Sequence, residues 1–159
     1  MLSQSRLVLV SLLSTIALYW GPPITGAWPV VKVVEVTAQA SGNEAAQKAL
    51  TEGLQLYKQG TAESLRKAIA KFEEALKLYQ EAGDRGGEAV TLSSIGTVHS
   101  DLGEQQKALE YYNQSLSLFR AVGDRGGEAV TLSSIGTVHS DLGEKQKALE
   151  YYNQSLPLI

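Results

Sequence analysis

The chain has 159 residues, with 14 basic and 17 acidic side chains and a net charge of −3. A chain with this slight excess of acidic residues lacks the basic surface that attracts nucleic acid or an anionic membrane, so neither is expected as a partner. The chain has no cysteine, which excludes a disulfide-stapled scaffold and thiol catalysis.

The first 40 residues have the layout of an export leader. Arg6 precedes an apolar run at residues 7–20, and small residues follow at Ala27 and Ala40. A charged start, an apolar core and small residues in this order are typical of a secretory signal peptide. We therefore predict an exported protein, periplasmic or extracellular, with residues 1–40 as leader and cleavage after Ala27 or Ala40. An uncleaved membrane anchor and a plain N-terminal extension remain as alternatives, although about 20 apolar residues are needed to span a bilayer.

Most of the remaining chain is a repeat. Residues 83–116 and 123–156 have the same sequence, except that Gln105 becomes Lys145. A more divergent copy precedes them and aligns if three residues are inserted after Gly60. A period of this length indicates a stack of one structural unit, in which each unit buries its apolar face against its neighbours.

Each unit has the apolar spacing of two helices separated by a turn. The first segment places Leu92, Ile95 and His99 on one face, and the second does the same with Leu109, Tyr112, Leu116 and Phe119. Gly103 ends the first helix and Gly123 the second, where Asp124 can cap the next. Gly96 in mid-helix costs about 1 kcal/mol relative to alanine unless another helix backbone passes close by.

The spacing of large and small residues resembles the tetratricopeptide repeat. The residues that carry the resemblance are Leu92, Ile95, Gly96, Gly103, Ala108, Tyr112 and Ser115, with their counterparts Leu132, Ile135, Gly136, Gly143, Ala148, Tyr152 and Ser155. His99 and His139 stand where that family usually has tyrosine. The resemblance implies an all-α fold: a right-handed α-solenoid of antiparallel helix pairs at 41–159, with three repeats at about 45–82, 84–122 and 124–159. The 40-residue period resembles a long bacterial variant often found upstream of caspase-like (CHAT) protease domains.

The sequence offers no convincing catalytic site. His99, Ser100 and Asp101 have the residue types of a catalytic triad, but adjacent residues on a helix point about 100° apart and cannot converge. The glycine-rich GDRGGE segment follows a helix and lacks the Lys-Ser/Thr of a phosphate-binding loop. His99 and His139 alone are too few ligands for a metal. We predict no catalysis, no cofactor and no metal.

The resemblance also implies a binding surface, because the first helix of each pair lines the concave side of such arrays. The residues that it places there are Ser93, Ser94, Thr97, Ser100, Asp101, Ser133, Ser134, Thr137, Ser140 and Asp141. They include no Lys, Arg or Asn, so a clamp for a peptide's terminal carboxylate is not expected. The predicted partner is a protein or an extended peptide that is neutral or basic.

The predicted function is therefore a non-catalytic protein–protein interaction scaffold. Two alternatives stay open: a truncated sensor or regulatory arm of a larger enzyme such as a CHAT protease, and a scaffold tethered to the membrane by the leader. The C-terminal helix carries an apolar stripe that no further repeat covers, comprising Leu149, Tyr152, Leu156 and Leu158. An exposed stripe of this kind predicts self-association through the C-terminal helix.

Overall fold

The structure is a computed structural model of the full chain, and it describes the backbone of residues 30–158 and the side chains of residues 41–158. The apolar run of the leader and Ala27 lie outside the described residues. The described residues contain α-helices and one short 3-10 turn, and no strand. The helices are α2 (Val30–Tyr57), α3 (Ala62–Ala82), α4 (Arg85–Asp101), α5 (Gln105–Val122), α6 (Arg125–Asp141) and α7 (Lys145–Ser155), and the turn is η1 (Leu156–Leu158).

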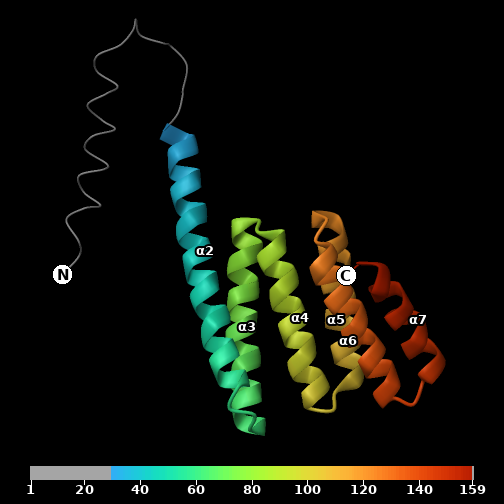
Figure 1. The fold of residues 1–159 in the computed structure, drawn as a ribbon. Coiled ribbons are helices and arrows are strands. Elements are labelled where there is room, and N and C mark those ends of the chain that lie inside the picture. The colour runs from blue at the N-terminus through green and yellow to red at the C-terminus, as the bar shows by residue number, and fades with distance from the viewer. Residues whose placement is uncertain (1–29, 159) are drawn as a thin grey trace, which may run out of the picture. The chain divides into compact units, whose positions relative to one another are not determined.

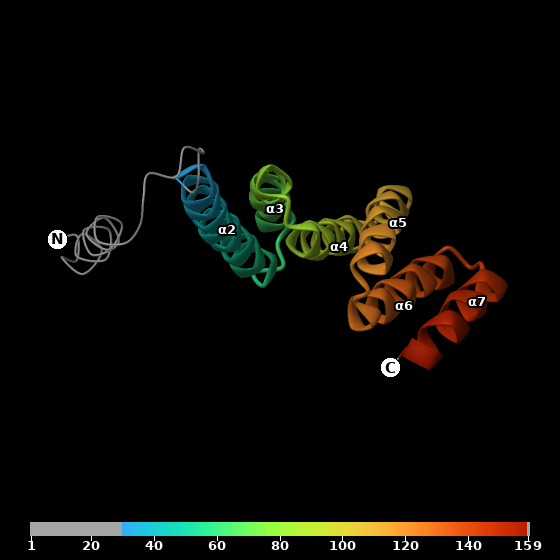
Figure 2. The same cartoon turned by 90° about the horizontal axis from the view of Figure 1, so that it is seen from above.

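The helices form three successive pairs, α2/α3, α4/α5 and α6/α7 (Figure 1). Consecutive helices from α3 to α7 contact one another, and α4 also contacts α6. Seen from above, α2, α4 and α6 lie along one side of the stack, and α3, α5 and α7 lie along the other (Figure 2). The predicted all-α solenoid of repeated helix pairs is confirmed. No helix of the described part has the length and hydropathy that a membrane span requires.

The first helix begins earlier than the sequence indicated. We placed the first repeat at about residue 45, whereas α2 begins at Val30 and runs without a break to Tyr57. Glu35–Ile159 forms one compact unit. Residue 40, one of the two predicted cleavage points, therefore lies inside a helix.

Glycine and aspartate set the boundaries between repeats as predicted. Gly83 and Gly123 adopt left-handed conformations with φ of 69° and 74°, which other residues rarely adopt. Asp84 and Asp124 then cap the next helix by accepting hydrogen bonds from the backbone N–H groups of Gly87 and Gly127, each at 2.9 Å. The GDRGG segments are therefore helix boundaries.

Glycines inside the helices make room for aromatic rings. The nearest atoms to a Cβ built at Gly96 belong to the ring of Tyr112, and at Gly53 they belong to Phe72. The three nearest atoms at Gly96 thus belong to an aromatic ring of the paired helix. At the equivalent Gly136 a backbone atom is among the three nearest: a Cβ there would lie 3.2 Å from the carbonyl oxygen of Ala148 in the paired helix.

The C-terminal end also differs from the prediction. Helix α7 ends at Ser155, and the 3-10 turn that follows packs against α6. The guanidinium of Arg125 donates to the carbonyl oxygen of Pro157 at 3.0 Å and holds this turn in place. Of the predicted uncovered stripe, Leu149 and Leu156 are exposed, but Tyr152 lies against Gly136 and Leu158 packs on the core.

Candidate functional site

The predicted binding residues lie on α4 and α6 in two equivalent rows, which we call the Ser/Thr face. On α4, Asp101 is exposed and the other four side chains are half-buried. On α6, Ser133 and Ser134 are half-buried, and Thr137, Ser140 and Asp141 are exposed. Helices α4 and α6 are in contact, so the two rows lie on neighbouring helices.

Four of the eight hydroxyl groups on this face donate their hydrogen to their own helix. Ser94 and Thr97 donate to the carbonyl oxygens of Val90 and Ser93, at 2.9 and 3.0 Å. In the next repeat, Ser134 donates to the carbonyl oxygen of Val130 at 3.0 Å, and Thr137 to that of Ser133 at 3.1 Å. A hydroxyl has one donor and two acceptor positions, so these four groups offer only acceptor positions to a ligand.

Two tyrosines of the second helices support the face from behind. The Tyr112 hydroxyl donates to the Thr97 Oγ1 at 3.0 Å, and the Tyr152 hydroxyl lies 3.2 Å from the Thr137 Oγ1. Because Thr137 already donates to the Ser133 carbonyl, Tyr152 is the donor in the second pair. Burial raises the pKa of Tyr112, so its hydroxyl stays protonated and keeps this role.

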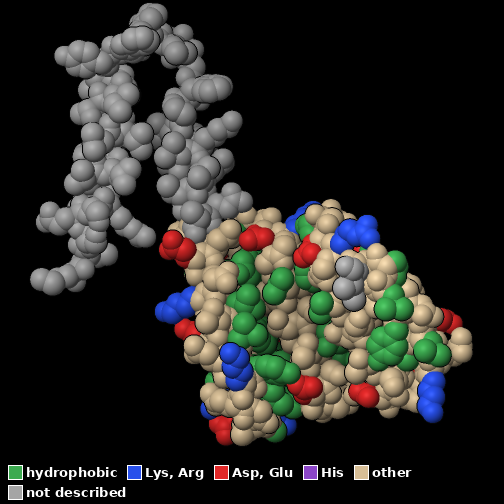
Figure 3. Space-filling model, in the orientation of Figure 1, with side chains coloured by type: hydrophobic (Ala, Val, Ile, Leu, Met, Phe, Trp, Pro, Cys, Tyr) green, Lys and Arg blue, Asp and Glu red, His purple; other side chains and the backbone are tan. Residues whose placement is uncertain are grey.

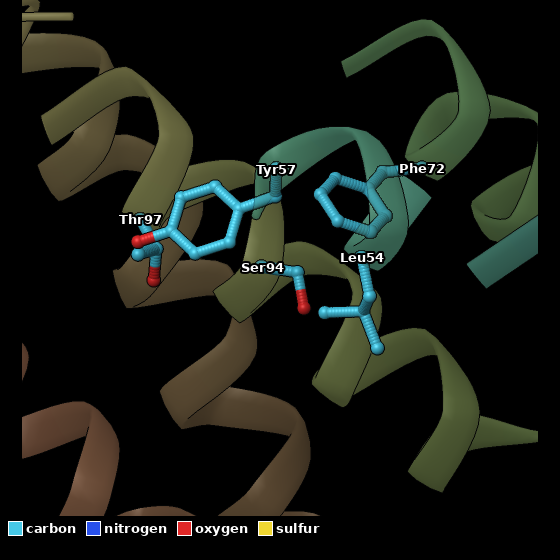
Figure 4. Close-up of a pocket in the computed structure, with 5 residues that line it drawn as sticks. All are labelled: Leu54, Tyr57, Phe72, Ser94 and Thr97. Atoms are coloured by element: carbon cyan, nitrogen blue, oxygen red, sulfur yellow. The ribbon is translucent and has the colours of Figure 1, made fainter. Parts of the chain in front are cut away.

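A cavity of about 190 Å³ lies between α2 and α4 (Figure 4). Its lining residues are Leu54, Tyr57, Phe72, Ser94 and Thr97. In Figure 4 the Tyr57 ring extends across the cavity with its hydroxyl toward Thr97, and Leu54 and Phe72 lie at the other end. This cavity combines an apolar end with the acceptor oxygens of Ser94 and Thr97.

A second, larger cavity of about 580 Å³ lies on α6, next to η1. It is lined by Gly126, Ala129, Val130, Ser133, Ser134, Thr137 and Leu158. Its mixture of apolar and hydroxyl side chains resembles that of the first cavity. In the view of Figure 3, hydrophobic and uncharged polar side chains occupy the middle of the described surface, and most charged ones lie toward its edges.

The contribution of the first helix pair to this surface was not predicted from the sequence. Leu54, Tyr57 and Phe72 line a cavity that the predicted residues Ser94 and Thr97 only complete. Lys58, which is exposed, aligns with Asp101 and places a positive charge at the corresponding position of the first repeat. The alignment with three residues inserted after Gly60 was the sequence signal that could have identified these residues of the first repeat.

The histidines have a structural role. His99 is buried and stacks on Tyr111 with ring centroids 5.3 Å apart, and its Nδ1 lies 2.8 Å from a carboxylate oxygen of Glu104. Ser100 donates to the Gln105 side chain, and Asp101 accepts from Tyr57, so His99, Ser100 and Asp101 have separate partners. The described residues hold no cluster of three or more His, Cys, Asp or Glu side chains that could bind a metal.

The family model described as "Tetratricopeptide repeat" matches residues 61–121 and 108–159. The chain belongs to the tetratricopeptide repeat family. Among solved structures it is similar to the tetratricopeptide repeat domain of FLU from Arabidopsis, with a TM-score of 0.67 and 20% identity over 73% of this chain and 95% of that one. At this identity the likeness shows the fold alone. A comparison with curated proteins finds no match.

As in other tetratricopeptide repeat proteins, the fold indicates an interaction module. Five of the ten predicted residues line the two cavities: Ser94 and Thr97 the first, and Ser133, Ser134 and Thr137 the second. The exposed backbone of an extended peptide has N–H groups that could meet the acceptor oxygens of this surface.

Proposed function

We propose that this tetratricopeptide repeat array is a non-catalytic scaffold that binds an extended segment of another protein along the Ser/Thr face. One observation carries the proposal: four hydroxyl groups of this face donate their hydrogens within their own helices. Their oxygens therefore remain as hydrogen-bond acceptors beside the two partly apolar cavities. An extended peptide supplies backbone N–H donors together with side chains for the cavities. The partner is neutral or basic, because Asp101 and Asp141 are the charged residues of the face.

The proposal is tested with a panel of extended eight-residue peptides and the full chain, using fluorescence polarisation. Replacing Ser94→Phe places a ring in the cavity of about 190 Å³ and should abolish binding of peptides that the unmodified chain binds. Ser117→Phe is the matched control, because Ser117 is an exposed serine of α5 outside the Ser/Thr face. Equal loss of binding in both variants would contradict the proposed location, and the absence of any bound peptide would contradict the function.

A second contact involves the outward face of α7 and the η1 turn that follows it, which carry Leu149 and Leu156 respectively. Leu149 and Leu156 are 55% and 66% exposed, whereas their counterparts Leu109 and Leu116 are 8% and 6% exposed in the preceding repeat. We propose that this face supports self-association. In the alternative function, as a sensor or regulatory arm of a larger enzyme such as a CHAT protease, the same face would contact the remainder of that enzyme.

For localisation, we propose export through the leader, with a membrane-anchored form as the alternative. Cleavage after Ala27 would leave α2 whole, whereas cleavage after Ala40 would cut it. We therefore favour Ala27. N-terminal sequencing of the protein from a bacterial host tests this: Met1 on soluble cytoplasmic protein would contradict export, and Met1 on membrane-bound protein would support the anchor.

A further inference from the structure

Two carboxylates of the Ser/Thr face occupy the same position in consecutive repeats but differ in their surroundings. Asp101 ends α4 and Asp141 ends α6, and the sequences of the two helices are identical. The Asp101 carboxylate accepts a hydrogen bond of 2.8 Å from the hydroxyl of Tyr57. A hydrogen-bond donor from the first helix of the preceding repeat therefore reaches the carboxylate of Asp101.

The corresponding donor is missing beside Asp141. The residue of α4 that aligns with Tyr57 is Ser100, whose side chain is much shorter and donates instead to Gln105 at 3.3 Å. Within the described residues, the side chain of Asp141 is exposed and has no hydrogen bond or ion pair. The third repeat thus keeps the acceptor carboxylate, as Asp141, but has no tyrosine at the position from which Tyr57 donates to Asp101.

The neighbouring groups indicate which kind of ligand fits. One turn before Asp141, Thr137 donates to its own helix and accepts from Tyr152, and it borders the cavity of about 580 Å³. An acidic group beside hydroxyl acceptors favours a ligand group with several donors and a positive charge. A phenol offers one donor, whereas the ammonium of lysine offers three and the guanidinium of arginine offers five.

We propose that Asp141 binds a lysine or arginine side chain of the extended peptide, in the position equivalent to that of the Tyr57 hydroxyl at Asp101. This assignment rests on the proposed function, because it requires a peptide on the Ser/Thr face. It makes Asp141 a specificity-determining residue. Asp101 contributes less to this selection, because its carboxylate already accepts a hydrogen bond from Tyr57.

The test compares two acetylated and amidated eight-residue peptides of alternating Val and Ser that differ only in a central Lys or Gln. Binding to the full chain is followed by NMR, through the amide signals of Thr137 and Asp141. We expect the Lys peptide to bind about two to five times more tightly, as for an ion pair at an exposed site. The preference should decrease as the salt concentration rises.

Two variants of the repeat form a matched pair. Asp141→Asn should remove the preference for the Lys peptide, whereas Asp101→Asn should retain it. If both peptides bind equally, or if the preference survives Asp141→Asn, the assignment is wrong while the proposed function stands. If neither peptide binds, both are wrong.

A third variant tests the geometry without a ligand. Ser100→Tyr should recreate the contact of Tyr57, so that the introduced phenol donates to Asp141 and competes with the Lys peptide. Its pKa, followed by ultraviolet titration, should lie above that of an ordinary tyrosine and should fall when Asp141→Asn is added. An introduced phenol with an ordinary pKa would show that Asp141 is out of reach and would overturn the assignment.

Discussion

The ring of Tyr112 lies directly against the backbone of Gly96. A Cβ built at position 96 would be 2.9 Å from the Cδ1 atom of this ring, which is closer than real Cβ contacts. The Tyr112 side chain is buried and its hydroxyl is bonded to Thr97, so the ring cannot move aside without losing that bond. Position 96 therefore has no room for a side chain.

We predict that Gly96→Ala lowers the free energy of unfolding by about 1–3 kcal/mol, because overpacking outweighs the gain in helix propensity. Gly86→Ala is the control, since a Cβ there would meet Asp84 at an ordinary distance of 3.5 Å. That change should be neutral or stabilising by up to about 1 kcal/mol. Urea denaturation followed by circular dichroism measures both, and equal effects would contradict the packing described for Gly96.

The buried hydroxyl of Ser115 links two helices of one repeat. It donates to the carbonyl oxygen of Ala89 at 2.8 Å, whereas its counterpart Ser155 donates to Tyr152 within its own helix. We predict that Ser115→Ala costs about 1 kcal/mol of stability and Ser155→Ala costs less. Thermal denaturation of the two variants makes the comparison, and a larger effect at Ser155 would be inconsistent with it.

The stability of the array should decrease in acid. Hydrogen bonds from Lys107 and His99 hold the pKa of Glu104 below its ordinary value, and those from His139 and Lys147 do the same for Glu144. A lowered pKa means that the folded state binds the proton less readily than the unfolded state does. The stabilisation is therefore present above the ordinary glutamate range of about pH 4–5 and is lost as the pH falls through the lowered values.

Denaturation midpoints between pH 7 and pH 3 measure this loss. The double change Glu104→Gln and Glu144→Gln should reduce the decline at low pH. The control is Glu110→Gln together with Glu150→Gln, because these glutamates are exposed counterparts in the same two helices. If the two double variants decline equally with acid, the two histidine–glutamate pairs do not cause the loss.

The hydrogen bond between Tyr57 and Asp101 should be visible in a titration of the phenols. The hydrogen bond to the Asp101 carboxylate raises the pKa of Tyr57 to about 12, because ionisation would remove the donated proton, and burial adds to the rise. Asp101→Asn should bring this pKa back toward about 10, the usual value for tyrosine. Ultraviolet difference spectra against Tyr57→Phe identify the signal, and an unshifted phenol in the unmodified chain would rule the contact out.

Because the pKa of Tyr57 is raised in the folded state, its contribution to stability is complete below the unfolded value of about 10. The contribution is lost as the pH rises through the folded value. Stability should therefore decline less steeply with alkali in Tyr57→Phe than in the unmodified chain. Guanidinium denaturation between pH 8 and pH 12 provides the measurement.

Self-association through α7 is tested by sedimentation velocity. Leu149→Gln combined with Leu156→Gln should shift the full chain toward monomer, because both leucines are more than half exposed on the outward face. Leu142→Gln is the matched control, since Leu142 is 47% exposed but belongs to the C-cap of α6 and not to α7 or η1. A monomeric unmodified chain at high concentration would show that the face does not support self-association.

The sequence was sufficient to predict the repeat and the helix pairs, whereas the binding role of the Ser/Thr face stays a prediction. These features depend on local patterns: apolar spacing specifies the helices, and Gly83 and Gly123 end them. Because the two later repeats are nearly identical, each helix and turn assigned in one copy applies to the other. The confirmed part of the prediction is therefore the part that one repeat specifies by itself.

The tertiary structure was needed wherever two repeats meet or where the repetition ends. The cavity beside Ser94 depends on Leu54, Tyr57 and Phe72 of the divergent first repeat. The hydrogen bond between Tyr57 and Asp101 joins residues 44 positions apart, and no local pattern contains both. At the other end, the turn at Pro157 leaves Leu158 half-buried against the core while Leu149 and Leu156 remain exposed. Such contacts depend on how neighbouring repeats pack, whereas helix spacing is already encoded within each repeat.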